Sequence, residues 1–462
     1  MQAEEISYLD PVQAFAPWAA QPWSIFLDSA REDGALGKHS FICVQPCRRM
    51  TVAGGQFLLD NQPVESDPFT CLESLLGAHA APALAGLPPF QGGAAGFIGY
   101  EMGRYLEKVD APGADDLGLP DMAMGVYDQI IAFDLHARRA WILTRDLGAK
   151  DAEKRRARLR QNLALARATP LPPAPQTFDA KRWRGNFPRD VYEQAVSRVV
   201  RYILEGDIFQ ANIAQRFAVS LGPGFDRFGF YRRLREVNPA PFSAFLEMGD
   251  YALASSSPER FLHLSRGRVE ARPIKGTRPR GQTPEEDAAL AAELGASEKD
   301  RAENVMIVDL LRNDLSRVCM DHEVEVPALC ALESYASVHH LVSAVTGRLR
   351  PECNAMDALR AAFPGGSITG APKIRAMQII AELEPHRRGP YCGAIGYLGF
   401  DGGMDMNIAI RTVAINARQA VFHAGGGIVA DSVPSAEYFE SLDKARALFA
   451  AFGLRPPDVR PS

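Results

Sequence analysis

A carboxyl group and an amine are the first residues whose placement in this chain suggests chemistry. Glu259 lies in Ser257-Pro258-Glu259, and Lys275 follows sixteen residues later, before a glycine and at the end of a predicted strand. Two strands in a hairpin would bring both groups to one end of a sheet. Burial there would lower the pKa of the amine and make it a nucleophile, while the carboxyl protonates a leaving group. From the pattern alone, a structural salt bridge is the favoured interpretation.

Carboxylates at helical spacing form the second candidate site. Asp300 with Glu303, and Glu437 with Glu440, are each three residues apart, so each pair lies on one face of a predicted helix. If the two faces meet, they provide the oxygen ligands that Mg²⁺ accepts. Lys444 follows Glu440 by one helical turn, and an ordinary surface ion pair explains either helix taken alone.

Two glycine-rich stretches could present backbone N–H groups to an anion. Gly425, Gly426 and Gly427 lie between apolar, strand-like residues, and Pro364–Lys373 precedes a predicted helix. Neither stretch has the lysine and hydroxyl spacing of a phosphate-binding P-loop. Tight turns explain both stretches equally well.

The elements that hold these groups begin with strands in the first 150 residues. Apolar runs predict strands at Ser24–Asp28 and Gly125–Phe133. The stretch Gly92–Tyr100 lacks the spacing of a dinucleotide loop and is predicted to be a closely packed strand. A charged helix from Lys150 to Ala168 leads into the proline-rich connector Thr169–Pro175, where we place the main boundary.

Beyond the connector, helices and strands occur in clusters rather than in regular alternation. Three- and four-residue apolar spacing, together with helix start and stop signals, predicts helices at about 189–203, 284–294, 298–311, 356–362, 372–383 and 436–452. Predicted strands include 207–217, 393–397, 406–415 and 420–423. The clustering favours an α+β fold with large antiparallel or mixed sheets. We expect two regions, 1–180 and 181–455.

Composition excludes several classes of protein. The chain has 462 residues, 47% of them hydrophobic, and a formal net charge of −5 without a basic stripe, so nucleic acid is not an expected partner. Its seven cysteines form no C-x-x-C pair, which argues against zinc and for free thiols in a reducing compartment. No apolar run is long enough to span a membrane, and the acidic N-terminus does not resemble a signal peptide, so we expect a cytoplasmic protein.

Together these motifs resemble the chorismate-utilising enzymes, the family of anthranilate, isochorismate, salicylate and aminodeoxychorismate synthases. The resemblance rests on ordered motifs over about 191–452, namely Gly206–Gln210, Ser257–Glu259, Pro273–Arg278, Asp300–Leu310, His340–Ser343, Phe363–Lys373 and Gly425–Ser432. It implies the chorismate-binding, anthranilate synthase-like fold, a sandwich of large sheets with helices packed outside. The first 180 residues resemble the amidotransferase-coupled members more loosely.

The resemblance also implies roles for individual residues. Lys275 would be a covalent nucleophile and Glu259 the general acid and base, with His340 and Thr369 beside C4 of the substrate ring. Glu303 and Glu440 would hold Mg²⁺, with Asp300 and Glu437 close by. The residues implied in binding chorismate are Gln210, Gly276, Thr277, Tyr391, Arg411, Gly425, Gly426, Gly427 and Lys444.

Two positions separate the reactions within the family. Members that use water as nucleophile carry a lysine where this chain has Gln210, and anthranilate synthases usually carry alanine where it has Lys275. The resemblance therefore implies amination at C4 of chorismate, as in the aminodeoxychorismate synthases of 4-aminobenzoate and folate biosynthesis. Ammonia would come from glutamine through a separate class I glutaminase in a heterodimer, because no stretch here resembles that domain.

Three further expectations remain open at this point. Related N-terminal regions hold tryptophan, and the residues around Trp23-Ser24 and Asp28-Ser29 are where such a pocket would lie. The first alternative function is that of anthranilate synthase component I, which eliminates pyruvate and aromatises the ring. The second is a non-catalytic binding protein, against which the presence of Glu259, Lys275, Glu303 and Glu440 argues.

Overall fold

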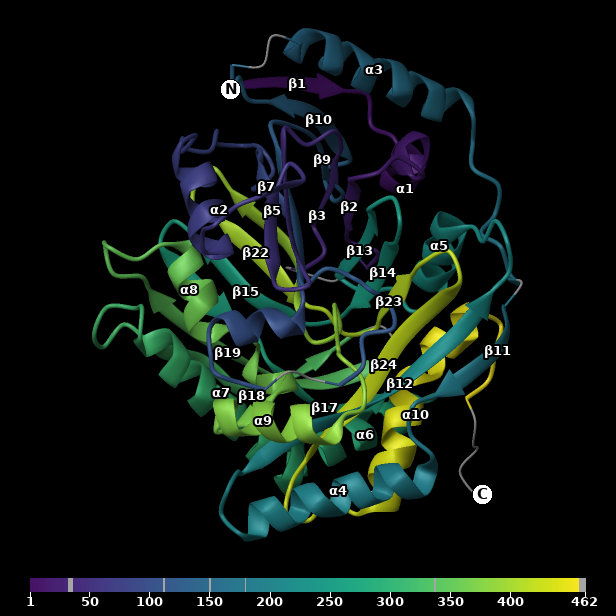
Figure 1. The fold of residues 1–462 in the computed structure, drawn as a ribbon, viewed down its shortest axis with the longest axis vertical. Coiled ribbons are helices and arrows are strands. Elements are labelled where there is room, and N and C mark those ends of the chain that lie inside the picture. The colour runs from purple at the N-terminus through teal and green to yellow at the C-terminus, as the bar shows by residue number, and fades with distance from the viewer. Residues whose placement is uncertain (32–35, 111–112, 149–150, 179, 336–337, 457–462) are drawn as a thin grey trace.

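Two twelve-stranded antiparallel sheets dominate the structure, a computed structural model that describes residues 1–31, 36–110, 113–148, 151–178, 180–335 and 338–456 (Figure 1). In the first sheet the strand order is β1 (Gln2–Ile6), β10 (Arg139–Thr144), β9 (Gln129–Asp134), β3 (His39–Cys43), β2 (Ser24–Asp28), β13 (Phe242–Glu247), β14 (Ala252–Ser257), β23 (Thr412–Ile415), β24 (Gln419–Ile428), β12 (Gln210–Leu221) and β11 (Ala180–Gly185), with β20 (Gly370–Ala371) on β12.

The second sheet carries most of the residues predicted to do chemistry. Its order is β17 (Ile274–Pro279), β19 (Val338–Arg348), β16 (Arg268–Ala271), β15 (Arg260–Ser265), β22 (Met404–Ile408), β21 (Ala394–Gly399), β7 (Gly93–Ile98), β8 (Met122–Tyr127), β4 (Arg48–Ala53), β5 (Gln56–Leu59) and β6 (Gln62–Pro63), with β18 (Glu325–Ser334) on β19.

The sheets pack face to face through apolar side chains. One buried cluster joins Ile25, Phe41 and Leu246 of the first sheet to Phe97 and Tyr397 of the second, and the rings of Phe41 and Tyr397 lie 5.6 Å apart. The sandwich expected from the sequence is therefore confirmed.

Helices cover the outer faces of the sandwich. On the first sheet, α4 (Arg189–Leu204) and α10 (Pro434–Ala451) contact each other, and α10 and α5 (Arg227–Val237) contact the sheet (Figure 1). On the second, α6 (Pro284–Ala296) and α7 (Glu298–Ser316) contact β17, β18 and β19. The remaining helices are α1 (Pro11–Phe15), α2 (Pro68–Gly77), α3 (Ala152–Ala168), α8 (Ala355–Ala362), α9 (Lys373–Leu383) and short 3-10 turns at Ala16–Trp18, Tyr100–Tyr105 and Gly366–Ile368.

Helix α4 shows how local sequence sets an element. Its buried side chains include Tyr192, Val196 and Val199, which recur at three- and four-residue steps along the face toward the sheet. The helix ends before Gly206, whose φ of +86° is a conformation that glycine adopts without strain.

The predicted helices are present, and the predicted strands differ in two places. Lys150, where we expected a helix to begin, lies outside the described residues. The stretch Gly125–Phe133 is not one strand but parts of β8 and β9, separated at Asp128, whose carboxylate binds Arg155 of α3. Likewise 406–415 divides into β22 and β23, because the chain turns at Arg411, where φ is +52°.

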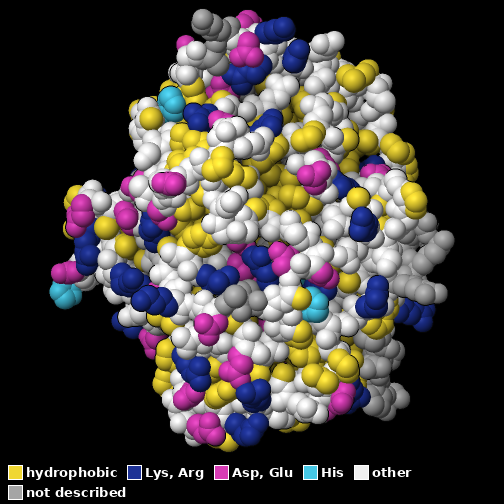
Figure 2. All heavy atoms as spheres, in the orientation of Figure 1, with side chains coloured by type: hydrophobic (Ala, Val, Ile, Leu, Met, Phe, Trp, Pro, Cys, Tyr) yellow, Lys and Arg dark blue, Asp and Glu magenta, His cyan; other side chains and the backbone are white. Residues whose placement is uncertain are grey.

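The expected division near residue 180 does not coincide with a break in either sheet. Strand β2 pairs with β13, and β7 pairs with β21, so strands from both sides of the connector lie side by side in both layers. The division into two regions stays a prediction. Figure 2 shows positive and negative side chains interspersed over the viewed face, in keeping with a net charge near neutrality. Within the described residues, no helix is both long and apolar enough to cross a membrane.

Candidate active site

The predicted hairpin does place Glu259 and Lys275 at the same end of a sheet. Strands β15 and β16 form an antiparallel hairpin in which His263 pairs with Glu270, and the same register carried back to Glu259 sets it opposite Ile274. Strand β17, which contains Lys275, continues from β16 along the same partner, β19. Local topology therefore brings both residues to one end of the sheet, where the Lys275 charge acts on the Glu259 carboxyl.

Glu259 is a buried carboxyl group held in place by a hydroxyl. Its side chain is 6% exposed, and Ser367 Oγ donates a hydrogen bond of 2.9 Å to its Oε1 atom. Burial raises the pKa of Glu259 to about 7, against the opposing effects of Ser367 and the Lys275 charge. A carboxyl with that pKa is partly protonated near neutral pH and can act as an acid.

Lys275 lies among charges of both signs. Its Nζ atom is 3.9 Å from Glu303 Oε2, so its ion pair goes to the α7 carboxylate rather than to Glu259. Burial lowers the pKa of Lys275, opposed by the Glu303 charge and assisted by the positive charge of Lys444. The lowered pKa increases the fraction of neutral amine, the form that can be a nucleophile.

The two carboxylate faces meet, as the helical spacing predicted they could. The charge of Glu440 on α10 raises the pKa of Glu303 on α7, although burial is the larger cause. Lys299 of α7 lies 3.8 Å from Glu437 Oε1, and Lys444 lies 2.7 Å from Glu440 Oε1. The acidic surfaces of the two helices thus face each other, with lysines between them.

These carboxylates suit Mg²⁺ only in part. Among the described residues, no group of three or more His, Cys, Asp or Glu side chains has the geometry to hold a metal ion. Glu303 and Glu440 can supply two oxygen ligands, and Mg²⁺ in proteins commonly takes one or two carboxylates and completes its shell with substrate and water. The donor set therefore fits that ion together with an anionic substrate.

Two glycines leave room where a side chain would collide with the carboxylates. A Cβ atom on Gly426 would lie 3.2 Å from Glu437 Oε2 and 3.4 Å from Glu440 Oε1. A Cβ on Gly276, whose φ is +80°, would lie 2.9 Å from the side chain of Asp300. These glycines let backbone approach the acidic helices closely.

A third glycine faces a polar side chain instead. A Cβ on Gly427 would lie 2.7 Å from Gln210 Nε2. Gln210 is fully buried, and neither polar atom of its amide has a hydrogen-bond partner in the part of the chain that the structure describes. Because buried amides are normally paired, these atoms are free to bind a ligand or water. Gly425 differs again, since its carbonyl accepts a hydrogen bond of 3.0 Å from Lys444.

His340 lies beside β17. Its Nδ1 atom is 2.9 Å from Thr277 Oγ1, and burial lowers its pKa to about 4, so the ring is neutral at physiological pH. The positive charge of Arg411 contributes to that lowering. His339 points elsewhere, toward Asp287 at 2.9 Å.

Arg411 and Tyr391, both predicted to bind the substrate, are coupled electrostatically. Burial lowers the pKa of Arg411, and within the described residues no carboxylate forms an ion pair with its guanidinium. Tyr391 is close enough to oppose that shift, and its ring stacks on His423 with centroids 5.0 Å apart. A partly buried guanidinium without a carboxylate partner suits an anionic ligand.

Thr369 lies beside β12, the strand that contains Gln210. Its carbonyl accepts a hydrogen bond of 2.8 Å from Asn212 N–H, and its hydroxyl donates to the Gly365 carbonyl. The structure therefore gathers the predicted residues around β12, β17, β24, α7 and α10. Their roles stay predictions.

Three contacts in this region were not expected from the sequence. Ser367 binds Glu259, Lys299 faces Glu437, and Ser432 Oγ donates to Glu437 at 2.7 Å. Ser367 and Ser432 lie inside motifs that were recognised in the sequence. These motifs indicated that the two segments belong to the site, but not which side chains the serines contact.

A separate cavity of about 160 Å³ lies between the sheets and is lined from both halves of the chain. Asp28 and Ser29 line it together with Phe41, Phe242 and Tyr397, whereas Trp23 and Ser24 are not among its lining residues. Its lining combines these aromatic rings with charged side chains, among them Lys38, Arg260 and Asp405, and such a mixture is the character of a small-molecule site.

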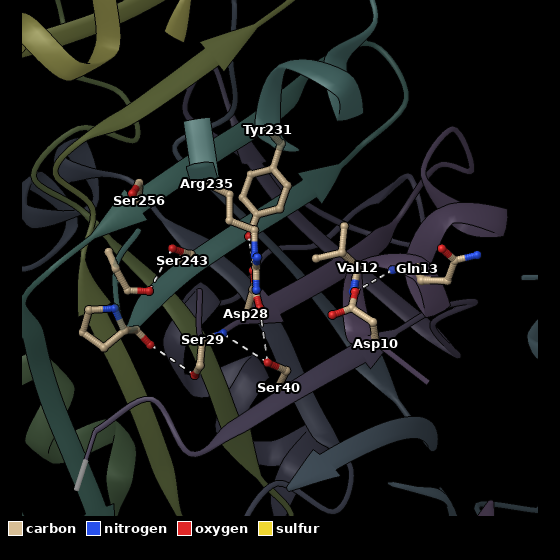
Figure 3. A network of polar contacts seen from close by, with 12 residues as sticks. Asp10, Val12, Gln13, Asp28, Ser29, Ser40, Tyr231, Arg235, Ser243 and Ser256 are labelled. Carbon is tan, nitrogen blue, oxygen red and sulfur yellow. Dashed lines mark hydrogen bonds and ion pairs between the residues drawn. The ribbon is translucent and has the colours of Figure 1, made fainter. Parts of the chain in front are cut away.

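A buried polar network fixes one wall of this cavity (Figure 3). Tyr231 Oη and Arg235 Nε donate hydrogen bonds of 2.8 and 2.6 Å to Asp28 Oδ2, and Ser40 Oγ lies 3.3 Å from Asp28 Oδ1. Ser29 is held through its N–H by Ser40 at 3.1 Å. Both carboxylate oxygens of Asp28 are therefore hydrogen-bonded within the protein, and Ser29 lies beside Asp28 in the cavity wall.

Comparison with known proteins decides the family. Residues 24–450 match the family described as chorismate binding enzyme. The chain belongs to the chorismate-binding enzymes. It is therefore an enzyme that acts on chorismate, and the family resemblance inferred from its motifs is confirmed.

This chorismate-binding enzyme is similar to relatives whose names give two different reactions. It is 43% identical to aminodeoxychorismate synthase component 1 of Klebsiella aerogenes, over 94% of each chain. It is 40% identical to anthranilate synthase component 1 of Pseudomonas aeruginosa, over 97% of this chain and 94% of that one.

Solved structures agree with the fold of this chorismate-binding enzyme. Anthranilate synthase component I from Streptococcus pneumoniae superimposes with a TM-score of 0.80 at 34% identity, covering 96% of this chain and 99% of that one. The isochorismate synthase MenF of Escherichia coli shares the fold, with a TM-score of 0.72 at 18% identity, covering 98% of this chain and 94% of that one.

Proposed function

We propose that this chorismate-binding enzyme is the synthase component that aminates chorismate at C4 to give 4-amino-4-deoxychorismate. The observation that carries the proposal is Lys275, a buried lysine with a lowered pKa beside Glu259, whose pKa is raised to about 7. A nucleophile and an acid at one end of a sheet suit the replacement of a hydroxyl group.

In the proposed reaction, the neutral Lys275 amine forms a bond to C2 of the ring as the C4–oxygen bond breaks. Glu259 donates its proton to the departing hydroxyl, which leaves as water, and then takes up the proton that the bonded lysine nitrogen releases. Ammonia then forms a bond to C4 as the bond between Lys275 and C2 breaks, Glu259 returns its proton to the lysine nitrogen, and the new C4 ammonium group releases a proton that restores Glu259. The double displacement retains the stereochemistry at C4. Overall, chorismate and ammonia become the aminated product and water.

Charge complementarity supports a dianionic substrate. Arg411 is a partly buried cation without a carboxylate partner among the described residues, and Tyr391 acts on it electrostatically. We propose that both orient one substrate carboxylate, and that Glu303 and Glu440 bind Mg²⁺ opposite the other. When bound, the ion would supply charge neutralisation for that carboxylate and for the developing charge on the leaving oxygen.

We propose that the ammonia comes from glutamine through a separate glutaminase subunit, as a component of a heterodimer. The relatives named component 1 support a partner, because that name implies a second component. This chain would then use free ammonium in the absence of the partner.

The test is product identity from chorismate, Mg²⁺ and ammonium, followed by mass and fluorescence. We expect a product in which one hydroxyl is replaced by an amino group and the enolpyruvyl ether is retained. Anthranilate fluorescence without any added lyase would overturn the proposal in favour of the anthranilate synthase reaction, which the 40% identical relative performs by name.

We also propose that the cavity beside Asp28 and Ser29 binds tryptophan. Its walls of Phe41, Phe242 and Tyr397 suit an indole ring, and Ser29 offers a polar contact at one side. Calorimetric titration with tryptophan is expected to show saturable binding, with valine as the control. Equal heats for both amino acids would contradict this proposal and leave the amination unaffected.

A further inference from the structure

Arg388 is a buried arginine outside the residues named so far. It follows α9 and is 2% exposed. Its Nε and Nη2 atoms donate to the two oxygens of Glu384 at 2.8 and 2.6 Å, and this fork-to-carboxylate pair fixes the plane of the guanidinium. Glu384 is fixed in turn by the Ala214 N–H of β12 at 2.9 Å.

The other donors of Arg388 bind the backbone of the candidate active site. Nη1 donates to the Ile368 carbonyl at 3.0 Å, and Nη2 donates to the Asn212 carbonyl at 2.8 Å. Ile368 immediately precedes Thr369, and Asn212 lies two residues after Gln210 on the same strand. One guanidinium therefore links the segments that carry Thr369 and Gln210.

The flat faces of the same guanidinium lie against aromatic rings. Its carbon atom is 4.7 Å from the ring centre of Tyr100 and 5.7 Å from that of Tyr391. Tyr391 N–H also donates to the Arg388 carbonyl at 3.2 Å. Arg388 thus supports Tyr391, which is predicted to bind the substrate, through both side chain and backbone.

The backbone of Arg388 is itself anchored. The N–H groups of Arg388 and Gly389 donate to the two oxygens of Glu101 at 2.8 and 2.9 Å. Glu101 belongs to the 3-10 turn Tyr100–Tyr105, so the N-terminal half of the chain fixes the position of this arginine. The Nε atom and both terminal nitrogens of Arg388 donate to acceptors of the protein itself. Its guanidinium therefore binds protein groups, not substrate.

We propose that Arg388 is a positioning residue for chorismate, which sets Thr369, Gln210 and Tyr391 in one wall of the site. The inference rests on the proposed function for the roles of those three residues. A lysine in its place keeps a charge but lacks the planar fork, so it cannot hold Glu384 with two bonds and reach both carbonyls. Replacement by lysine therefore separates the role of the guanidinium's shape from the role of its positive charge.

The test compares Arg388→Lys with Arg145→Lys. Arg145 is a matched control, since it is also buried, binds the carbonyls of Gln91, Ala81 and Pro82, and lies against Phe400. None of these partners is a predicted site residue. The measurements are the Kd for chorismate with Mg²⁺ by calorimetry, KM with ammonium, and folding by circular dichroism.

We expect Arg388→Lys to raise both the Kd and the KM for chorismate about tenfold, the effect of losing one charge-assisted hydrogen bond. Arg145→Lys should lower the melting temperature and leave both constants within about twofold, as other structural losses do. Equal constants in the two folded variants would overturn the positioning role.

A milder variant covers the case in which Arg388→Lys does not fold. Glu101→Gln removes one anchor of the Arg388 backbone and is expected to raise the chorismate Kd about threefold. An unchanged Kd in that variant would also overturn the inference. If the wild type binds chorismate but makes no aminated product, the proposed function fails while the Kd comparison still decides the role of Arg388.

Discussion

The Nζ atom of Lys275 lies 3.9 Å from Glu303 Oε2, and this ion pair connects the proposed nucleophile to the carboxylates proposed to bind Mg²⁺. Lys275 comes from β17 and Glu303 from α7, and Glu440 of α10 acts electrostatically on both. A cation between Glu303 and Glu440 would compete with the ammonium form of Lys275. Binding of Mg²⁺ is therefore expected to favour the neutral, nucleophilic amine.

Lys275→Ala is expected to lower ammonium-dependent turnover by at least about 10²-fold, because it removes the nucleophile. Lys373→Ala is the matched control. Lys373 is equally buried, has a lowered pKa because of burial, and pairs with Asp314 at 2.7 Å outside the predicted site. The control should lose stability while its folded fraction keeps turnover within a few-fold. Similar losses in both variants would count against covalent catalysis.

The pH dependence of turnover should be bell-shaped. Glu259 must be protonated and Lys275 neutral, so kcat is expected to fall on both sides of an optimum that lies between their two pKa values. Glu259→Gln, which cannot lose a proton, is expected to remove the alkaline fall in whatever turnover remains. The same alkaline fall in Glu259→Gln and in the wild type would exclude Glu259 as the acid.

Stability gives an independent check on Glu259. Its pKa is raised from 4.5 to about 7 on folding, so the native state binds more protons between those values, and the free energy of unfolding falls as pH rises across that window. Glu259→Gln removes this cost. The variant is expected to raise the melting temperature, relative to wild type, more at pH 8 than at pH 5, and equal shifts would contradict the pKa.

Metal dependence is tested by Glu303→Gln. This change removes one proposed Mg²⁺ ligand charge and should raise the Mg²⁺ concentration for half-maximal activity about tenfold. Glu298→Gln, an exposed position on the same helix, is the control and should not shift it. Full activity of the wild type after exhaustive chelation would remove the metal from the account.

Gly426→Ala tests the space between β24 and α10. The added methyl would lie 3.2 Å from Glu437 Oε2 and 3.4 Å from Lys444 Nζ, so it should displace these side chains. We expect the KM for chorismate to rise about three- to tenfold with the fold retained. Gly295→Ala, where nothing lies within 4 Å, should leave the KM unchanged.

The sequence predicted contacts between residues close together in the chain better than contacts between distant ones. Glu259 and Lys275 are joined by a local hairpin, and their short separation in the sequence was enough to place them at one end of a sheet. The meeting of α7 with α10 is a long-range contact, which helical spacing permits but does not require. It was anticipated only because the motifs resembled a known family.

Other features have no local signal at all. The pairing of β2 with β13 merges the two halves of the chain into continuous sheets, and no residue near the connector indicates it. Arg388 is similar, because its partners Ile368, Asn212 and Glu101 come from separate parts of the sequence. A buried arginine reveals its role only when the acceptors around it are known.

Peptide mass spectrometry tests directly whether Lys275 forms a bond to the substrate ring. Wild-type protein would be incubated with chorismate and Mg²⁺ without ammonium, then quenched in acid and digested. We expect an adduct of chorismate less one water on the peptide that contains Lys275, and we expect it to disappear when ammonium is added. Absence of the adduct in a protein that aminates chorismate at full rate, or the same adduct in Lys275→Ala, would contradict covalent catalysis by Lys275.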